Sequence, residues 1–394
     1  MELPVTANEN LPVPVLQNWI ARNSGSPISG TFEYPLYSDA KFLQSITNSD
    51  SPYNFFNPMP SRAEPGYVQA SLILRLDDHL PHMRPDHSKT DASRYHGGTI
   101  TDEIAALASL CVGVRIRAGG ASRYFTNPDK EPLGVPVALD RRPKPSLDLD
   151  KDRLVLPQVA ISCGLNELQR LGWLLHLSPD QSIALVRAAR LYQDALWIAE
   201  SEPALAWLMF VSSLEAAANQ WKSEAGTPVD RLTYSKPKLV EILKNAGGDD
   251  LVESVASQIE TTLGATKKFV DFTLDFFPEP PMKRPCEEFQ ISWNNKQMRK
   301  VLRRVYDYRS KALHGGTPFP APMCDPPFSN SKNEYAEKGT IGLAASSGGG
   351  VWRDKDVPIN LHVFHHIVRG ALLKWWEKMA NGSTKVRNEQ RSGQ

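Results

Sequence analysis

The strongest constraint on the fold is the spacing of apolar residues in the second half of the chain. From about residue 165 to residue 380, apart from the segment 315–357, apolar residues recur every three or four positions, as in amphipathic helices. Ser178 followed by Pro179, and Pro203 further on, are typical helix starts. The predicted helices cover 166–176, 179–202, 203–221, 235–246, 250–277, 292–314 and 359–380. The sequence therefore predicts an all-α bundle over 165–380.

The first part of the chain has a different pattern. Residues 66–78 alternate apolar and polar positions, as a half-buried strand does. Thr101 and Asp102 are typical cap residues and open a predicted helix. Further strands are predicted over 112–120, 134–139 and 154–161. Residues 65–162 are therefore expected to form a small α+β domain, with a linker over the proline-rich and charged segment 140–152.

Three other segments lack a clear period. Residues 1–64 contain eight prolines and are predicted to be an irregular N-terminal arm. Residues 315–357 contain five prolines within ten positions and later an SSGGG run. A connection of that length without secondary structure is usually functional or mobile. Residues 381–394 are expected to be a disordered tail. The predicted class is α+β, with a small α+β N-terminal domain followed by the helical bundle.

Composition excludes several classes of protein. The chain has 394 residues, a net charge of +1, and 41% hydrophobic and 23% charged residues, which is ordinary for a soluble globular protein. Its four cysteines form no CxxC pair, which argues against a zinc ribbon or a disulfide framework. No secretory signal and no run of about 18 apolar residues is present, so no membrane partner is expected. We predict a cytoplasmic protein without a cofactor.

The segment 294–316 is the most informative one. Asn294 or Asn295 is placed to cap a helix, and Gly315 and Gly316 are placed to end it. The helix carries seven Lys and Arg residues against the single acid Asp307, although the whole chain is almost neutral. This excess predicts contact with an anionic partner, and the alternative is an ordinary solvated surface. The candidate phosphate-binding residues are Arg299, Lys300, Arg303, Arg304 and Lys311.

The end of this helix resembles a known signature. YRSKALHGG is similar to the last turns of the signature helix of HEPN domains, with Arg309, Ser310 and His314 at the motif positions. FVSSLEAAANQW, which contains Glu215, and HHIVRGALLKWW resemble helices of the Apea-like branch of that family. The resemblance covers roughly 165–380. Asparagine is common in the family after the arginine, and Ser310 stands there in this chain.

The resemblance implies a metal-independent endoribonuclease that uses the ribose 2′-OH and leaves a cyclic phosphate. Histidine titrates near neutral pH, so His314 suits proton transfer. Arg309 suits a phosphate, because a guanidinium offers paired donors. Residues five apart on a helix point about 140° apart, which favours a site shared by two copies. We therefore expect an RNA substrate and a homodimer, and the resemblance extends to toxin-like or anti-phage effectors.

Other interpretations remain open at this point. Many HEPN domains have lost catalysis and serve as dimerisation or nucleotide-binding modules, and a basic helix also suits a DNA-binding regulator. His314 fits a helix C-terminal cap as well as a catalytic role. Glu215 is expected either to support catalysis or to pair with an arginine inside the bundle. The spacing of His362, His365 and His366 permits zinc binding, but no acidic or cysteine ligand accompanies them, so no metal is predicted.

Overall fold

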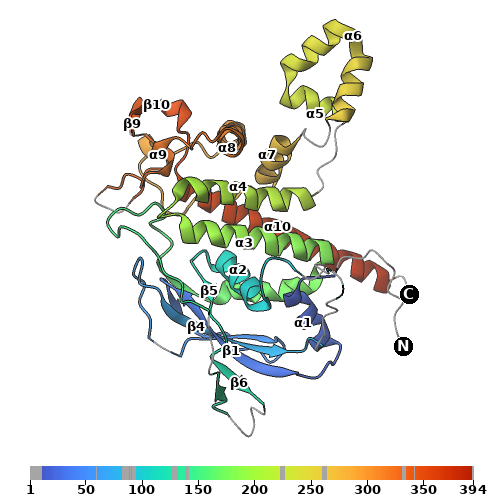
Figure 1. Ribbon diagram of the computed structural model, residues 1–394, viewed down its shortest axis with the longest axis vertical. Helices are drawn as coiled ribbons and strands as arrows, with labels where there is room; N and C mark the ends of the chain where they lie inside the picture. The colour runs from blue at the N-terminus through green and yellow to red at the C-terminus, as the bar shows by residue number, and fades with distance from the viewer. Residues whose placement is uncertain are drawn as a thin grey trace. The chain divides into compact units, whose positions relative to one another are not determined.

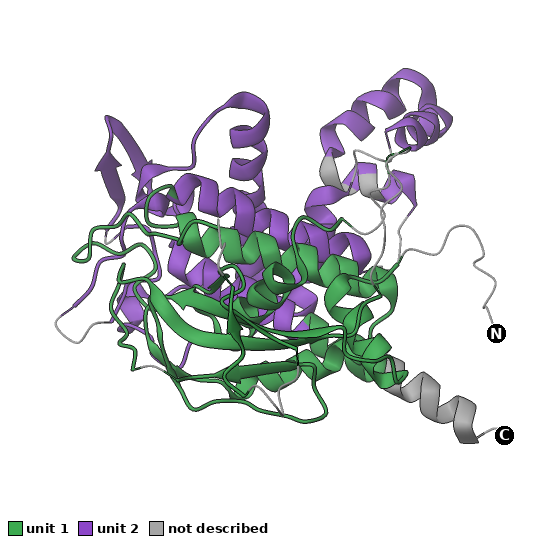
Figure 2. Cartoon of the chain, turned by 60° about the horizontal axis from the view of Figure 1, so that its bottom comes forward, with its two compact units in different colours: residues 1–202, 375–394 green, residues 203–374 purple. Residues whose placement is uncertain are grey.

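The computed structural model shows a mixed α+β protein, as the class prediction expected (Figure 1). The chain divides into two compact units, Met1–Glu202 with Trp375–Gln394, and Pro203–Lys374 (Figure 2). The structure describes residues 11–392 except 59, 82–87, 89, 91–94, 127–131, 138–141, 222–226, 260–263, 331–333 and 341, and describes only the backbone of 231, 234, 235 and 383–392.

The first unit is built on an antiparallel sheet. Its strands follow the order β3-β4-β1-β6-β7, and β5 also pairs with β1. The strands are β1 (Gly30–Ser38), β3 (Tyr53–Phe56), β4 (Gln69–Asp78), β5 (Arg117–Ala118), β6 (Arg123–Phe125) and β7 (Val135–Pro136). A separate parallel pair joins β2 (Lys41–Leu43) to β8 (Ser162–Gly164). Leu72, Leu74 and Leu76 alternate into the core along β4, so the strand predicted over 66–78 is confirmed.

The prediction of an irregular arm over 1–64 is wrong for the described residues. This segment contains α1 (Pro14–Asn23) and the central strand β1. Pro14 lies in the first turn of α1, where a missing N–H costs no hydrogen bond. Pro35 lies between the part of β1 that pairs with β6 and the part that pairs with β5. Both prolines therefore stand where regular structure tolerates them.

The strand predicted over 154–161 is also absent. Val155, Leu156 and Val159 are buried, but the segment is made of turns and bends. The Glu200 carboxylate accepts hydrogen bonds from the backbone N–H groups of Val155 (2.7 Å) and Leu156 (3.2 Å). A side chain thus satisfies donors that a strand partner would otherwise satisfy. The strand predicted over 134–139 is shortened to β7, and residues 138–141 lie outside the described residues.

Helices complete the first unit. They are α2 (Ile100–Val112), the 3-10 helix η1 (Asn166–His176) and α3 (Pro179–Ile198). Thr99 caps α2 together with Asp102, rather than Thr101 and Asp102 as predicted. Both η1 and α3 pack against α2. The predicted boundary near 162–165 is therefore wrong, because these two helices belong to the α+β unit and the division falls after Glu202.

Glu103 of α2 gives this unit a pH-dependent stability. Its carboxyl is fully buried, and burial raises its pKa to about 8. In the unfolded chain the group ionises near its ordinary pKa of 4.5. Between these two pH values only the unfolded state releases the proton. The free energy of unfolding therefore falls as the pH rises, by up to about 1.4 kcal/mol per pH unit. Urea unfolding from pH 5 to 8 is expected to show this slope, and Glu103→Gln is expected to flatten it; equal slopes would contradict the assignment.

The second unit is mainly helical. Its helices include α4 (Pro203–Gln220), α5 (Pro228–Ser235), α6 (Pro237–Gln258), α7 (Ala265–Asp275), α8 (Asn295–Gly315) and the first turns of α10 (Leu361–Ser392). Helix α4 packs against α7 and α8. The Trp207 ring stacks on Phe319 (5.4 Å) and Phe364 (4.7 Å). Because α10 continues to Ser392, the prediction of a disordered tail from 381 is wrong up to that residue. No helix in the described part of the chain is long and apolar enough to cross a membrane.

The segment between α8 and α10 has its own structure. It contains α9 (Ala321–Cys324), the antiparallel hairpin β9 (Ala344–Ser347) and β10 (Gly350–Arg353), and the short 3-10 helix η4 (Asp354–Asp356). The preceding connection holds another such helix, η3 (Glu287–Phe289). Buried Glu337 accepts hydrogen bonds from Nε and Nη2 of Arg284, at 2.7 and 2.6 Å, and from the backbone N–H of Ile291. These bonds fasten the segment to the rest of its unit.

Candidate functional site

Helix α8 carries all the predicted site residues except Glu215. The Asn294 side chain accepts a hydrogen bond from the Gln297 backbone N–H at 2.9 Å, which caps the start of the helix. Met298, Leu302 and Val305 bury one face. The helix ends at Gly316, whose positive φ of 62° suits a glycine. The predicted boundaries, cap and apolar face of this helix are therefore confirmed.

Arg309 is held by an acid from α4. Its Nη2 donates to Glu215 Oε2 at 2.6 Å, and the Tyr306 hydroxyl donates to Glu215 Oε1 at 2.8 Å. The Arg309 guanidinium also lies 5.5 Å from the centre of the Tyr306 ring. Burial, followed by the charge of Glu215, raises the pKa of Tyr306, so the phenol stays protonated. The expectation that Glu215 pairs with an arginine is thus confirmed.

This ion pair leaves part of the guanidinium available. The side chains of Arg309 and Glu215 are each 18% exposed, so the pair reaches the surface. Arginine has five N–H donors, and Glu215 takes one of them. Arg309 Nε is buried without a hydrogen-bond partner. Glu215 therefore orients Arg309 without using up its capacity to bind an anion.

His314 lies at the open end of the same helix. Its side chain is exposed and sits in the last turn, two residues before the Gly316 cap. Ser310 is half-buried one turn earlier, on a similar face of the helix. Among the described residues, no hydrogen bond or ion pair joins Arg309 to His314. Five residues apart on one helix, the two residues of the predicted catalytic pair point in directions about 140° apart.

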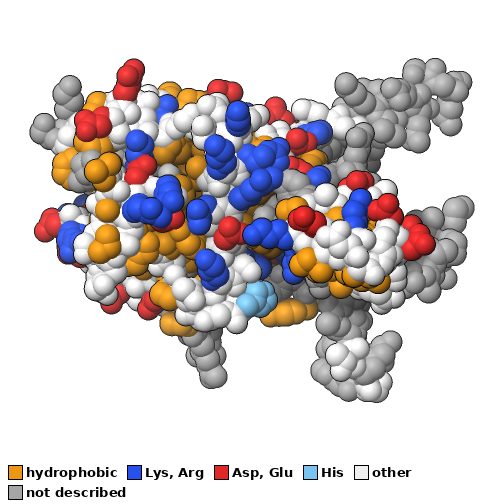
Figure 3. All heavy atoms as spheres, turned by 90° about the horizontal axis from the view of Figure 1, so that it is seen from above, with side chains coloured by type: hydrophobic (Ala, Val, Ile, Leu, Met, Phe, Trp, Pro, Cys, Tyr) orange, Lys and Arg blue, Asp and Glu red, His pale blue; other side chains and the backbone are white. Residues whose placement is uncertain are grey.

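The predicted phosphate-binding residues fall into two groups. Arg299 makes an ion pair with Asp271 of α7 at 2.7 Å, and Arg304 lies 3.8 Å from Asp356. Lys300, Arg303 and Lys311 are exposed. Figure 3 views the side of the molecule that lies uppermost in Figure 1, and Lys and Arg side chains gather in the middle of that face. The excess of positive charge persists, but acids from distant segments offset some of it.

Sequence reasoning missed three contributors to this site. Tyr306 precedes Arg309 by three residues and so shares its face, a helical spacing that was available as a signal. Asp271 and Asp356 approach α8 from other parts of the chain, and no local pattern reveals them. The sequence therefore overstates the free positive charge of the helix.

The three histidines of α10 have separate surroundings. His362 is half-buried, and the loss of solvent around its ring lowers its pKa to about 3. The His366 Nε2 lies 2.9 Å from the Glu279 carbonyl oxygen, and the His365 ring lies 5.7 Å from the Phe210 ring. Within the described residues, no group of three or more His, Cys, Asp or Glu side chains is arranged to hold a metal ion.

Comparison of the chain with protein-family models, with curated proteins and with solved structures found no match.

Proposed function

We propose that the protein is a metal-independent endoribonuclease of the HEPN type, with its site at the C-terminal end of α8. The observation that carries this proposal is the exposed His314, five residues after an oriented Arg309, on a helix with exposed cations. His314 removes the proton from a ribose 2′-OH or returns one to the leaving oxygen. Arg309 binds the phosphate as negative charge develops.

The proposed reaction needs only the RNA itself. The 2′ oxygen forms a bond to phosphorus while the bond from phosphorus to the 5′ oxygen breaks. The 2′ proton is lost to a base, and the 5′ oxygen gains a proton from an acid. The products are a 2′,3′-cyclic phosphate and a 5′-hydroxyl. Ser310 lies one turn before His314 and is proposed to hydrogen-bond the same phosphate.

A second copy of the chain completes the proposed site. Helix α8 is continuous from Asn295 to Gly315, so Arg309 and His314 stay about 140° apart. A two-fold axis beside α8 lets His314 of one copy approach Arg309 of the other. We therefore propose a homodimer. The resemblance to HEPN domains, rather than the geometry, is the ground for proposing a cytoplasmic toxin-like or anti-phage effector.

The test is cleavage of a single-stranded RNA by the purified full chain in EDTA. We expect cleavage to continue, because the proposed chemistry uses His314 and Arg309 rather than a metal. The same oligonucleotide with one 2′-deoxyribose should resist at that position, because the nucleophile is missing. Mass spectrometry of the fragments should find cyclic phosphate ends. Loss of cleavage in EDTA that magnesium restores would overturn the mechanism.

A binding module is the second candidate function. The Arg309–Glu215 pair favours it, because such a pair also serves simply to hold α8 against α4. This function predicts a dimer that binds RNA or a nucleotide and leaves the RNA intact in the same assay.

The exposed cations should dominate RNA binding. Neutralising Lys300 and Lys311 to Gln is expected to lower the slope of log Kd against log salt by about 0.7 for each lost contact with single-stranded RNA. Arg299→Gln is the matched control, because this cation already pairs with Asp271 and should change the slope less. Filter binding from low to high salt measures both. A double variant with the wild-type slope would mean that this surface only contacts solvent.

A further inference from the structure

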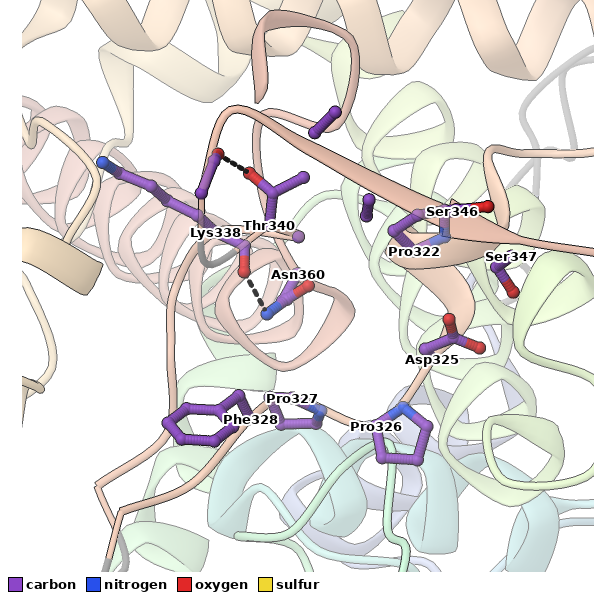
Figure 4. Close-up of a pocket in the computed structure, with 14 residues that line it drawn as sticks. Pro322, Asp325, Pro326, Pro327, Phe328, Lys338, Thr340, Ser346, Ser347 and Asn360 are labelled. Atoms are coloured by element: carbon purple, nitrogen blue, oxygen red, sulfur yellow. Dashed lines mark hydrogen bonds between the residues drawn. The ribbon is translucent and has the colours of Figure 1, made fainter. Parts of the chain in front are cut away.

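A pocket lies in the segment between α8 and α10, and neither Arg309 nor His314 lines it. Its volume is about 310 Å³, at the lower end for small-molecule sites. Figure 4 shows Pro326, Pro327 and Phe328 along one side and Asn360 facing the open space between the walls. The pocket therefore combines an apolar wall with a fixed polar group.

The orientation of Asn360 is set by its neighbours. Its side-chain nitrogen donates to the carbonyl oxygens of Ala336 (2.8 Å) and Lys338 (2.7 Å). Carbonyl oxygens only accept, so the nitrogen must face them and Oδ1 must face the other way. Figure 4 shows this oxygen directed into the pocket. Asn360 is only 3% exposed, so it presents a rigid acceptor.

The Asn360 side chain does not cap the helix that follows it. Asn360 directly precedes α10, where an asparagine oxygen usually caps the first backbone N–H groups. Here the N–H of Val363, which such a cap would bind, reaches the backbone oxygen of Asn360 instead, at 3.2 Å. No described residue donates a hydrogen bond to its Oδ1. The oxygen is thus left to accept a hydrogen bond from a molecule in the pocket.

The walls are rigid before any ligand arrives. Prolines have a fixed φ, and the Phe328 carbonyl accepts a hydrogen bond from the Ala336 N–H at 2.8 Å. The Phe328 ring contacts Phe289, with 6.0 Å between centroids, and remains 49% exposed. A flat apolar side chain beside a hydrogen-bond acceptor suits a planar molecule that carries N–H donors.

The pocket segment is attached to α8. The Tyr308 hydroxyl of α8 donates to the Asp356 carbonyl oxygen at 2.6 Å, and the Tyr308 ring lies 6.1 Å from Phe319. The Thr340 hydroxyl, which lines the pocket, in turn contacts the Asp354 carboxylate at 3.0 Å. The segment that holds the pocket is therefore packed against the helix that carries the exposed cations.

We propose that this pocket receives an unpaired nucleobase that bears an exocyclic amino group. The amino group donates to Asn360 Oδ1, and the base lies against Phe328. Uracil has no amino group, and its N3–H lies between two carbonyl oxygens that can only accept; we therefore expect it to bind more weakly beside the carbonyl-bonded Asn360 amide. The proposal rests on the proposed function in taking RNA as the ligand, and it assigns to this site the recognition of one base in the strand that is cleaved.

The test measures binding of the four ribonucleoside monophosphates to the full chain by saturation-transfer NMR. We expect AMP, CMP or GMP to bind and UMP to bind more weakly. Phe328→Ser should weaken the binding about tenfold through loss of stacking. Leu343→Ser is the matched control, since Leu343 is 93% exposed and does not line the pocket. Asn360→Ala should remove the preference over UMP; if this buried change prevents folding, Phe328→Ser decides alone.

The outcomes separate this site from the nuclease. Selective nucleotide binding without RNA cleavage would support the pocket and count against the proposed activity. Cleavage without nucleotide binding, or equal binding of all four nucleotides, would overturn the pocket. Binding of arginine amide in place of the nucleotides would also overturn it, by showing that the acceptors serve a cationic side chain of a protein partner.

Discussion

His314→Ala is expected to lower the rate of RNA cleavage by about 10²–10⁴-fold, the usual contribution of a general acid or base. The side chain is exposed and lies two residues before the end of α8, so its removal creates no cavity. RNA affinity should change little, because Lys300 and Arg303 remain. The measurement is a single-turnover cleavage rate, with RNA binding determined on the same preparation.

A helix-capping role predicts a different result. A cation in the last turn of a helix stabilises it by about 0.3–1 kcal/mol, so the variant would melt earlier and still cut RNA. His314→Gln separates the roles, because an amide keeps hydrogen bonding but cannot carry a proton. Arg309→Lys should cleave RNA more slowly than the wild type, since a single ammonium replaces a planar guanidinium that offers paired N–H donors. A folded His314→Ala protein with wild-type cleavage would end the assignment of this site.

Helix α8 was predictable because its signals are local. The Asn294 cap, the apolar positions and the terminal Gly316 all lie within the helix or beside it. The type of partner that Glu215 would have was also predictable. An acid in a strongly apolar helix needs a cation, and in the structure that cation is Arg309. Which arginine it meets depends on how α4 packs against α8, and no local pattern encodes that.

The predictions that were wrong also have a physical cause. Residues 14–56 were expected to be irregular because prolines interrupt their period, yet Pro14 and Pro35 occupy positions that need no N–H donor. The division after Glu202 was missed because α3 has the same helical pattern as α4 and differs only in its packing partner. Asn360 gave no signal, since its importance lies in two carbonyl oxygens that fix its amide.

Arg115→Met is expected to destabilise the α+β unit by about 3–5 kcal/mol, the usual cost of removing one partner from a buried ion pair. Arg115 bridges Asp39 and Glu200, at 2.8 Å each, and its Nε donates to the Leu196 carbonyl oxygen at 2.8 Å. All three side chains are at most 3% exposed. Without the guanidinium, two carboxylates would remain buried with no cation between them.

The stability lost in Arg115→Met should be measurable, because the total stability of a typical domain is about 5–15 kcal/mol. Urea unfolding followed by circular dichroism at neutral pH measures it. Arg117→Met is the matched control two residues away. Its ion pair with Asp194 is about 40% exposed on both sides, and such pairs contribute about 0–1 kcal/mol. A loss at Arg115 no larger than that at Arg117 would contradict a role for the buried charges.

A combined variant identifies the cause of the loss. If uncompensated charge is responsible, Arg115→Met together with Asp39→Leu and Glu200→Gln should recover much of the stability lost by Arg115→Met alone, since replacing a whole buried ionic group by apolar or neutral residues is often close to neutral. Recovery is expected to be incomplete, because Glu200 also accepts the N–H groups of Val155 and Leu156, and an amide accepts them more weakly than a carboxylate. If lost packing is responsible instead, the three substitutions should add, and the combined variant should be less stable than Arg115→Met.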